Sequence, residues 1–324
     1  FFKDEKIVTY KEGTTLHFRA VYEDNKVNME LYREDELLYI DTYVGDYTDK
    51  AIAKNPIKAI IYKMLVNYTG HELPWGTLTG IRPTKIATDH MENGVSDDDI
   101  IKDYEATYLA GINKGKICVE VARKETALYK NIDFENEYCL YIGIPFCPTT
   151  CLYCSFTSYP IVSYKDKVEA YIDALIKEME YVAKAYTNKR LIGIYIGGGT
   201  PSSIEARELD KLISNIYDAF DTTYLREFTV EAGRPDSITK DKLEVLKKHK
   251  VDRISINPQT MNDKTLKLIG RAHSVEDTKA AYALARELDF QNINMDMIIG
   301  LPGENMSDIT HTLDEIYKLA PDSL

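Results

Sequence analysis

Residues 141–156 read YIGIPFCPTTCLYCSF and place Cys147, Cys151 and Cys154 in a C-x3-C-x2-C pattern. Three thiols this close together are typical of a loop that holds a metal cofactor, because short spacings bring the sulfur atoms to one side of the loop. The apolar run 141–144 just before them predicts a buried strand. We therefore expect the cysteine loop to follow the carboxyl end of that strand.

Three thiolates can hold three corners of a cubane 4Fe–4S cluster and leave the fourth iron without a protein ligand. That iron can chelate the amino and carboxylate groups of S-adenosylmethionine, and an electron passed into the sulfonium then releases a 5′-deoxyadenosyl radical. The alternative is a structural zinc site with Cys139 as fourth ligand. Zinc sites usually come as paired C-x2-C units, and we expect Cys118 and Cys139 to be small buried residues instead.

The whole chain has 324 residues and a formal charge of −12, which suits an acidic protein with a large core. It has no block of positive charge, so non-specific binding to nucleic acid is disfavoured. No apolar run is long enough to cross a membrane and the start has no signal-peptide pattern. Five cysteines, three of them clustered, suit a reducing compartment, and we expect a cytoplasmic location.

Two domains are expected, an α+β domain over residues 1–136 and a larger α/β domain over 137–324. Alternating residues from Phe1 to about Gly45 predict a small antiparallel sheet. Asn55 and Pro56 are typical of the start of a helix, which would run to Gly70. A capping pattern at Ser96 and Asp99 predicts further helix towards Lys130.

The segment 74–85, PWGTLTGIRPTK, carries the only tryptophan and two cations, Arg82 and Lys85, where a helix is expected to start. Helix starts attract anions, so this pair is a candidate site for a substrate carboxylate. The alternative is a surface turn whose cations are solvated.

Strand and helix patterns alternate with short connections after the cysteine loop, which indicates a parallel sheet with right-handed crossovers. We expect a partial (β/α)6 TIM-like barrel in which a sixth strand starts at 322–324. The rest of the barrel and any later domain are expected to lie beyond the chain. The amino-terminal start is also expected to be missing. The predicted strands are 141–144, 191–196, 227–231, 253–257 and 292–298.

Candidate binding residues follow these strands, at the edge where barrels of this kind place their active sites. Glycines 197–199 would let the backbone approach the amino group of a ligand. Glu231 ends the third strand, where an acid can accept both hydroxyls of a ribose, although it could instead pair with Arg253 or Arg271. Further hydrogen bonds to an adenosyl or methionyl group are expected from Gln259, Arg271 and Asp296. A lone histidine such as His273 is usually structural.

Residues 141–324 resemble the oxygen-independent coproporphyrinogen III oxidase group of the radical S-adenosylmethionine superfamily. The three-cysteine run with Tyr153 before its last member is followed by GGGTP, RISINPQTMNDKTLKLIGR and NMDMIIGLPG in the order of that group. The segment PWGTLTGIRPTK resembles the HemZ-type branch. The resemblance implies that Cys147, Cys151 and Cys154 ligate the cluster. It implies a cofactor site made of Tyr141, Tyr153, Phe156, Gly198, Gly199, Thr200, Glu231, Gln259, Arg271 and Asp296.

The reaction implied by the resemblance is oxidative decarboxylation of two propionate groups of coproporphyrinogen III to vinyl groups. Tyr141, Arg82 and Lys85 are the catalytic candidates, and an electron donor such as flavodoxin or ferredoxin is the expected partner. Phe156 stands where these decarboxylases carry a fourth cysteine, and Gly143 where they often carry histidine. The alternatives are a haem chaperone of the same family, which also carries phenylalanine at this position, and a radical haem methyltransferase.

Overall fold

The computed structural model describes residues 1, 6–9 and 13–324, and these divide into two compact units, 1–132 and 133–324. The division falls in the connection between helix α4 and strand β4, which also contains the boundary expected from the sequence. Part of the predicted amino-terminal sheet, at residues 2–5 and 10–12, lies outside the described residues.

The amino-terminal unit begins with an antiparallel sheet in the order β1-β2-β3. Its strands are β1 (Leu16–Glu23), β2 (Lys26–Arg33) and β3 (Glu36–Val44). Alternate residues of the central strand, Val27, Met29 and Leu31, are buried and pack with Ala53 and Met64 of the following helix. The sheet thus buries one face of its central strand against a helix, whereas Phe18 and Tyr22 of β1 are exposed.

Helix α1 (Lys50–Thr69) shows that the predicted helix start at Asn55 is wrong. The carboxylate of Asp49 accepts hydrogen bonds from the backbone amides of Ala51 and Ile52, so the first turn is capped earlier than expected. Pro56 lies inside the helix and cannot donate to the carbonyl of Ile52. Ile52 itself is an exposed residue.

Three further helices, α2 (Thr84–Glu92), α3 (Asp97–Tyr108) and α4 (Ile112–Tyr129), share a second small core. The predicted cap at Ser96 is confirmed, because its hydroxyl accepts from the backbone amide of Asp99. The segment 74–79 is fastened to the turn between α3 and α4, where the amide of Thr77 donates to the carbonyl of Tyr108 at 2.7 Å.

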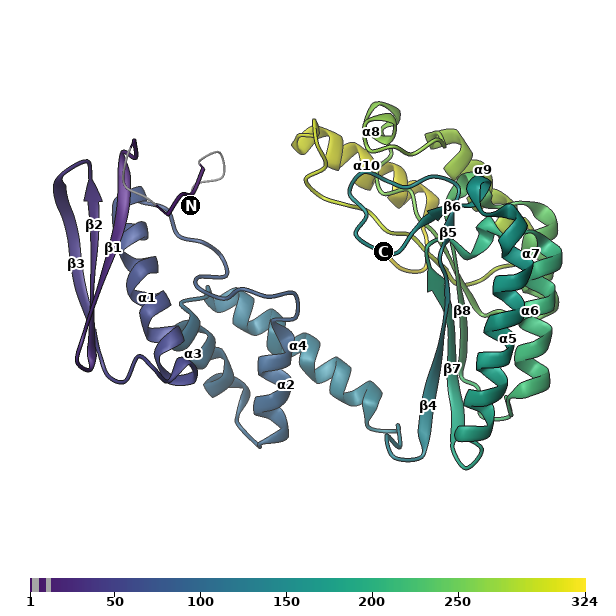
Figure 1. Cartoon of the computed structure of the whole chain (residues 1–324), viewed down its shortest axis with the longest axis horizontal. Coiled ribbons are helices and arrows are strands. Elements are labelled where there is room, and N and C mark those ends of the chain that lie inside the picture. Colours follow the sequence, from purple (N-terminus) through teal and green to yellow (C-terminus); the bar gives the residue numbers. More distant parts are fainter. Residues whose placement is uncertain (2–5, 10–12) are drawn as a thin grey trace. The chain divides into compact units, whose positions relative to one another are not determined.

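The second unit is built on a five-stranded, wholly parallel sheet in the order β10-β9-β8-β7-β4, which confirms the expected α/β class (Figure 1). Its strands are β4 (Glu137–Ile144), β7 (Arg190–Gly198), β8 (Glu227–Gly233), β9 (Arg253–Ile256) and β10 (Ile293–Asn294). Its helices are α5 (Val168–Ala185), α6 (Ala206–Ala219), α7 (Lys240–Lys248), α8 (Asp263–Leu268), α9 (Val275–Glu287) and α10 (Met306–Leu319).

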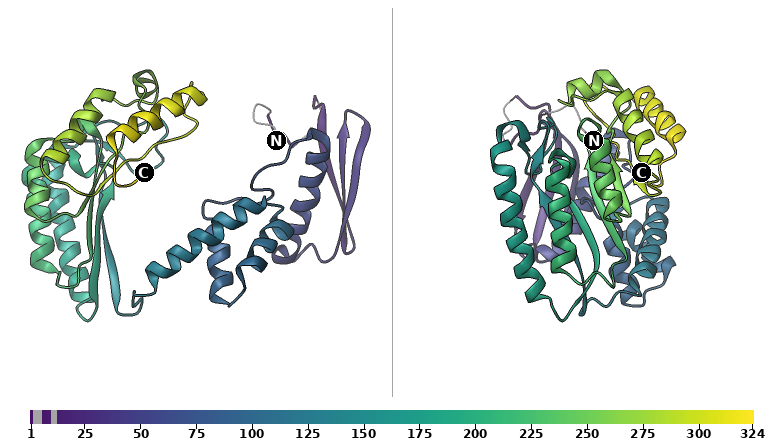
Figure 2. Two further views of the ribbon diagram at one scale, coloured as in Figure 1. Left: turned by 180° about the vertical axis from the view of Figure 1, so that it is seen from behind. Right: turned by 90° about the vertical axis from the view of Figure 1, so that its right-hand side faces the viewer.

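Helices α5, α6 and α7 lie side by side along one face of this sheet, and the view from behind shows the same layer (Figure 2). Their apolar faces and the buried strands form the largest core of the chain, with Ile144, Ile196 and Ile213 among its fully buried residues. All five strands run in parallel, so the loops at their carboxyl ends lie along one edge of the sheet.

The fifth strand is shorter than the predicted span 292–298, because β10 ends at Asn294. The amide of Met295 instead donates to the carbonyl of Ser323 at 3.0 Å, and Ser323 forms a parallel bridge with Asn294. The residues expected to start a sixth strand therefore lie beside β10.

Candidate functional site

The cysteine loop leaves the carboxyl end of β4 and is closed at its base by two short strands. Strand β5 (Phe146–Cys147) pairs in parallel with β6 (Tyr159–Pro160), and the amide of Tyr159 donates to the carbonyl of Pro145 at 2.8 Å. Cys147 ends β5, and the loop between the two strands contains Cys151 and Cys154. This is the position predicted from the sequence.

The loop is also tied to the turn that follows α8. The amide of Leu152 donates to the carbonyl of Ile269 at 3.0 Å, and the hydroxyl of Thr149 donates to the carbonyl of Gly270 at 3.2 Å. Cys147 and Cys151 are buried and Cys154 is partly exposed. Two of the three thiols are thus held in fixed, largely dry surroundings, while the third is open to solvent on one side.

The glycine loop after β7 lies directly against the cysteine loop. The amide of Gly199 donates to the carbonyl of Ile144 at 2.8 Å, and the amide of Thr200 donates to the carbonyl of Phe146 at 2.7 Å. A Cβ atom on Gly199 would lie 2.8 Å from the oxygen of Phe146 and 2.9 Å from the sulfur of Cys147. Glycine is therefore required here by the closeness of the two loops.

Two tyrosines and two carboxylates meet beside this loop at the ends of β4, β7, β8 and β10. Tyr141 and Tyr195 stack with their ring centroids 5.8 Å apart, and the hydroxyl of Tyr195 donates to a carboxylate oxygen of Glu231. Burial raises the pKa of Glu231, and the nearby carboxylate of Asp296 raises it further, against the hydrogen bonds from Tyr195 and the amide of Gly198. The side-chain partner of Glu231 is therefore Tyr195, whereas the alternative expectation was an ion pair with Arg253 or Arg271.

Gln259 lies three residues after β9, and Arg271 follows helix α8 and reaches back to the same connection. Gln259 has a φ of +66°, a region that non-glycine residues seldom occupy, and its backbone bonds to Asp296 and Ile298 on the neighbouring strand connection. Arg271 is buried and donates from Nη1 to the carbonyl of Asn257 at 2.5 Å. Its Nε and the amide oxygen of Asn257 are buried with no protein partner, which leaves two polar atoms available to a bound molecule.

Tyr153 belongs to the cysteine loop and lies close to both Arg271 and Cys151. Burial raises the pKa of its hydroxyl to about 12; the charge of Arg271 opposes this shift and the neighbouring Cys151 adds to it. Phe156, by contrast, projects into solvent with 76% of its surface exposed.

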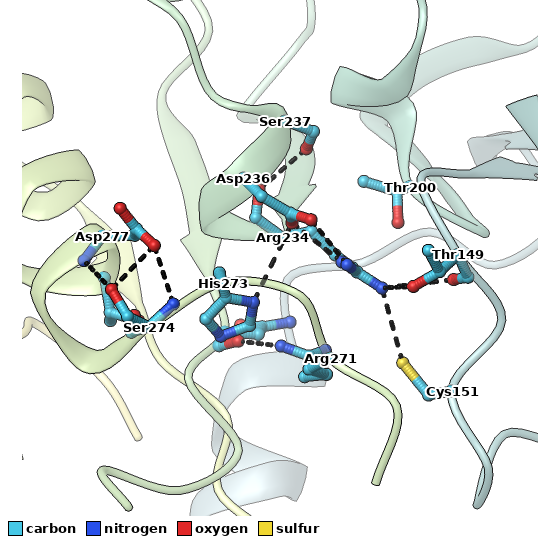
Figure 3. A network of polar contacts seen from close by, with 12 residues as sticks. Thr149, Cys151, Thr200, Arg234, Asp236, Ser237, Arg271, His273, Ser274 and Asp277 are labelled. Carbon is cyan, nitrogen blue, oxygen red and sulfur yellow. Dashed lines mark hydrogen bonds and ion pairs between the residues drawn. The ribbon is translucent and has the colours of Figure 1, made fainter. Parts of the chain in front are cut away.

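A buried arginine, which the sequence analysis did not select, joins the cysteine loop to the end of β8. Arg234 donates from Nη1 to the hydroxyl of Thr149 at 2.8 Å and to the sulfur of Cys151 at 3.8 Å (Figure 3). Asp236 holds the other side of the guanidinium through two hydrogen bonds of 2.9 and 2.6 Å. A signal was present, since the charged sequence GRPD at 233–236 comes two residues after the end of the third predicted strand.

The remaining predicted residues lie elsewhere. Arg82 and Lys85 belong to the amino-terminal unit, where an Nη atom of Arg82 is 4.0 Å from a carboxylate oxygen of Glu125. Cys118 is buried as expected, whereas the expectation for Cys139 is wrong, because it is exposed near the amino end of β4. An edge strand is covered on one side only, which leaves this side chain accessible.

The cysteine loop fits an iron–sulfur cluster by the chemistry of its donors. Its thiols receive hydrogen bonds from the Thr200 hydroxyl, 3.4 Å from the sulfur of Cys147, and from the guanidinium of Arg234, and hydrogen bonds to the sulfur atoms are common around protein-bound iron–sulfur clusters. Within the described parts of the chain, no three histidine, cysteine or acidic side chains form the arrangement that holds a single metal ion.

Comparison with known families decides the assignment, because residues 141–316 match the model of the radical SAM superfamily. The chain belongs to the radical SAM superfamily. Members of this superfamily use a 4Fe–4S cluster and S-adenosylmethionine, and the matched region contains the cysteine loop and the strand ends described above.

The relatives are of the HemN, HemZ and HemW type. The chain is 42% identical to the oxygen-independent coproporphyrinogen-III oxidase-like protein HemZ of Bacillus subtilis, over 86% of this chain and 57% of the relative. It is 38% identical to the heme chaperone HemW of the same organism, over 55% of this chain and 47% of the relative. The chain thus spans about half the length of these relatives.

Among solved structures, the coproporphyrinogen III oxidase HemN of Escherichia coli, a radical SAM enzyme, has a TM-score of 0.53 and 27% identity over 58% of this chain and 42% of that one. This likeness confirms the predicted fold of the second unit.

In the part of the chain that the structure describes, no helix is both long and apolar enough to cross a membrane.

Proposed function

We propose that the second unit holds a 4Fe–4S cluster through Cys147, Cys151 and Cys154 and binds S-adenosylmethionine at the adjoining strand ends. The observation that carries this proposal is the contact between the cysteine and glycine loops, where a Cβ on Gly199 would lie 2.9 Å from the sulfur of Cys147. When bound, the cluster and S-adenosylmethionine together supply a 5′-deoxyadenosyl radical.

The residues around this contact have distinct tasks. The backbone of Gly198 and Gly199 offers a close approach for the amino group of the cosubstrate. Tyr195 holds one oxygen of Glu231 and so orients the carboxylate towards the hydroxyls of a ribose. The unpartnered Nε of Arg271 and amide oxygen of Asn257 are suited to the polar groups of the adenosyl or methionyl moiety. Gln259, Asp296, Tyr141, Tyr153, Thr200 and Phe156 complete the proposed pocket.

The proposed reaction lies in tetrapyrrole metabolism, with oxidative decarboxylation of coproporphyrinogen III as the leading candidate. Its support comes from the names of the HemZ and HemN relatives. The chain's task would be to hold a propionate-bearing substrate against the radical carbon and to exclude water. Arg82 and Lys85 are the proposed propionate contacts, and flavodoxin or ferredoxin is the proposed electron donor, in the cytoplasm.

A second candidate is a haem chaperone, and Phe156 is the observation that favours it. This side chain is 76% exposed at the position where a fourth cysteine is expected in the decarboxylases. An exposed aromatic ring beside the cluster loop is suited to contact with the flat face of a porphyrin. The likeness to HemW supports the same reading.

The test is an anaerobic assay on the reconstituted and reduced protein, with and without coproporphyrinogen III, in which deoxyadenosine and porphyrin products are measured by mass spectrometry. Decarboxylated product with matching deoxyadenosine supports the enzyme, whereas stoichiometric haem binding without product supports the chaperone. A methylated haem product would identify a methyltransferase. Glu231→Gln tests the proposed cosubstrate site, because it keeps the shape of the pocket and removes the carboxylate, so deoxyadenosine formation should fall about tenfold.

A further inference from the structure

We propose that Arg234 is a positioning residue that sets the reduction potential of the cluster through Cys151. The carboxylate of Asp236 partly compensates the charge of the guanidinium. The inference rests on the proposed cluster and adds residues that neither the motif nor the resemblance indicates. The structural basis is a line of three groups, the carboxylate of Asp236, the guanidinium of Arg234 and the sulfur of Cys151 (Figure 3).

The guanidinium is fixed from both sides. Nε and Nη2 of Arg234 donate to the two oxygens of Asp236, which is the bidentate geometry that holds an arginine plane most firmly. Nη1 donates to both oxygen atoms of Thr149, the carbonyl at 3.2 Å and the hydroxyl at 2.8 Å. A lysine could supply the charge but not the planar pair of donors, because its ammonium is a single point charge.

The backbone that carries Arg234 is also fixed. The hydroxyl of Ser237 donates to the carbonyl of Arg234 at 2.7 Å. It also lies 2.6 Å from the hydroxyl of Ser202, three residues after Gly199. The guanidinium is therefore fixed beside the end of β8, and its hydrogen bonds to Thr149 restrain the cysteine loop.

Burial makes the charge of this pair effective at the sulfur. Only 3% of the Arg234 side chain is exposed, so little water screens its interaction with Cys151 at 3.8 Å. Asp236 is further from the sulfur, behind the guanidinium, so the positive end of the pair faces the cluster loop. Burial raises the pKa of Asp236, but its hydrogen-bonded Arg234 outweighs that effect and keeps the pKa below its ordinary value.

Hydrogen-bond donors and positive charge beside a cluster sulfur stabilise the reduced cluster, because reduction adds negative charge to the cluster. Hydrogen bonds and charges that contact a metal ligand tune the metal centre as well as orienting the ligand. Arg234 should therefore raise the potential, and loss of Asp236 should raise it again by leaving the guanidinium uncompensated. A merely structural pair would not give shifts of opposite sign.

The experiment is potentiometric titration of the reconstituted full chain, followed by electron paramagnetic resonance of the reduced cluster. Arg234→Gln should lower the equilibrium constant for one-electron reduction at least tenfold, which equals about 59 mV, and Asp236→Asn should raise the potential. Arg234→Lys should fall between Arg234→Gln and the wild type. The double variant keeps the pair neutral, as in the wild type, so its remaining shift reports the hydrogen bond to Cys151 together with the orientation of the two charges.

Arg286→Gln is the matched control. It removes the same charge from the second unit, where Arg286 pairs with Asp322 at 2.9 Å on the last turn of α9, and its potential should equal that of the wild type. If Arg234→Gln does not assemble a cluster, the signs for Arg234→Lys and Asp236→Asn decide the question. Unchanged potentials in loaded variants would overturn this inference alone, whereas a wild-type chain without a cubane spectrum would overturn the proposed function.

Discussion

The five cysteines of the chain occupy three different environments, and two of these predict opposite responses to substitution. Cys147, Cys151 and Cys154 share the loop after β4, whereas Cys139 is exposed near the other end of that strand and Cys118 is buried in the amino-terminal unit. Replacing any loop cysteine with serine should abolish the 4Fe–4S absorbance and deoxyadenosine formation, because a cluster corner loses its thiolate. Cys139→Ser is the control and should retain both.

Gly199 predicts a steric effect at the same loop. An alanine there would place its Cβ 2.8 Å from the oxygen of Phe146 and 2.9 Å from the sulfur of Cys147, and both are held by the fold. Gly199→Ala should therefore reduce iron content per chain severalfold. Gly143→Ala is the control, because its Cβ would meet only a ring carbon of Tyr141 at 3.7 Å. Equal iron contents in the two variants would contradict the close packing of the loops.

His273 predicts a dependence of stability on pH. Its ring is buried with neither nitrogen hydrogen-bonded, and its pKa is lowered from 6.5 to about 4, mainly by burial and further by Arg271, against the attraction of Asp236. Between these pH values the unfolded chain binds more protons than the folded chain, so the free energy of unfolding decreases as pH falls. The full shift corresponds to roughly 3 kcal/mol, at about 1.4 kcal/mol per pKa unit.

Urea unfolding between pH 7 and pH 4 measures this effect. The wild type should lose stability more steeply than a His273→Gln variant, which lacks the titrating group. Identical slopes for the two proteins would show that His273 does not remain neutral in the folded chain.

At this scale the sequence identified residues that belong to local patterns. The cysteine spacing and the glycines 197–199 are short-range signals, and both point to parts of the site that the structure brings together. Tyr195 and Arg234 were not identified, because their partners, Glu231 and Cys151, become neighbours only when separate strands align in the sheet. Register and loop closure, which a single sequence does not display, decide those contacts.

Among the elements, regular periodicity predicted the helices and strands of the second unit well, since each buries one consistent face. The errors lie at ends, where capping and pairing compete. Helix α1 begins at Lys50 because Asp49 caps it, although Asn55 and Pro56 are the stronger pattern. Strand β10 ends at Asn294, the last residue that pairs with β9, and parallel pairing resumes only as an isolated bridge between Gln259 and Met297.

The cap of α1 gives a prediction at this scale. Asp49→Ala removes the acceptor for two first-turn amides and should lower the free energy of unfolding by about 1 kcal/mol. Asp49→Asn keeps an acceptor oxygen and should retain most of that stability. Chemical denaturation of both variants checks this, and equal losses would point to charge instead of capping.

The whole molecule consists of two units with separate cores, and this division predicts independent folding. The large core of 133–324 draws its buried residues from that unit alone. A chain of residues 133–324 should therefore unfold cooperatively and still bind the cluster, whereas Arg82 and Lys85 would be lost with the other unit. Circular dichroism and iron analysis test this, and an unfolded fragment would contradict it.

The central claim is that three thiolates hold a cluster with one iron open to S-adenosylmethionine. The most direct measurement is Mössbauer spectroscopy of the reconstituted chain, labelled with iron-57, before and after addition of S-adenosylmethionine. The account predicts a 4Fe–4S spectrum in which one iron of the four changes its parameters when S-adenosylmethionine binds. A spectrum without a cubane cluster, or a cluster that S-adenosylmethionine leaves unchanged, would contradict it.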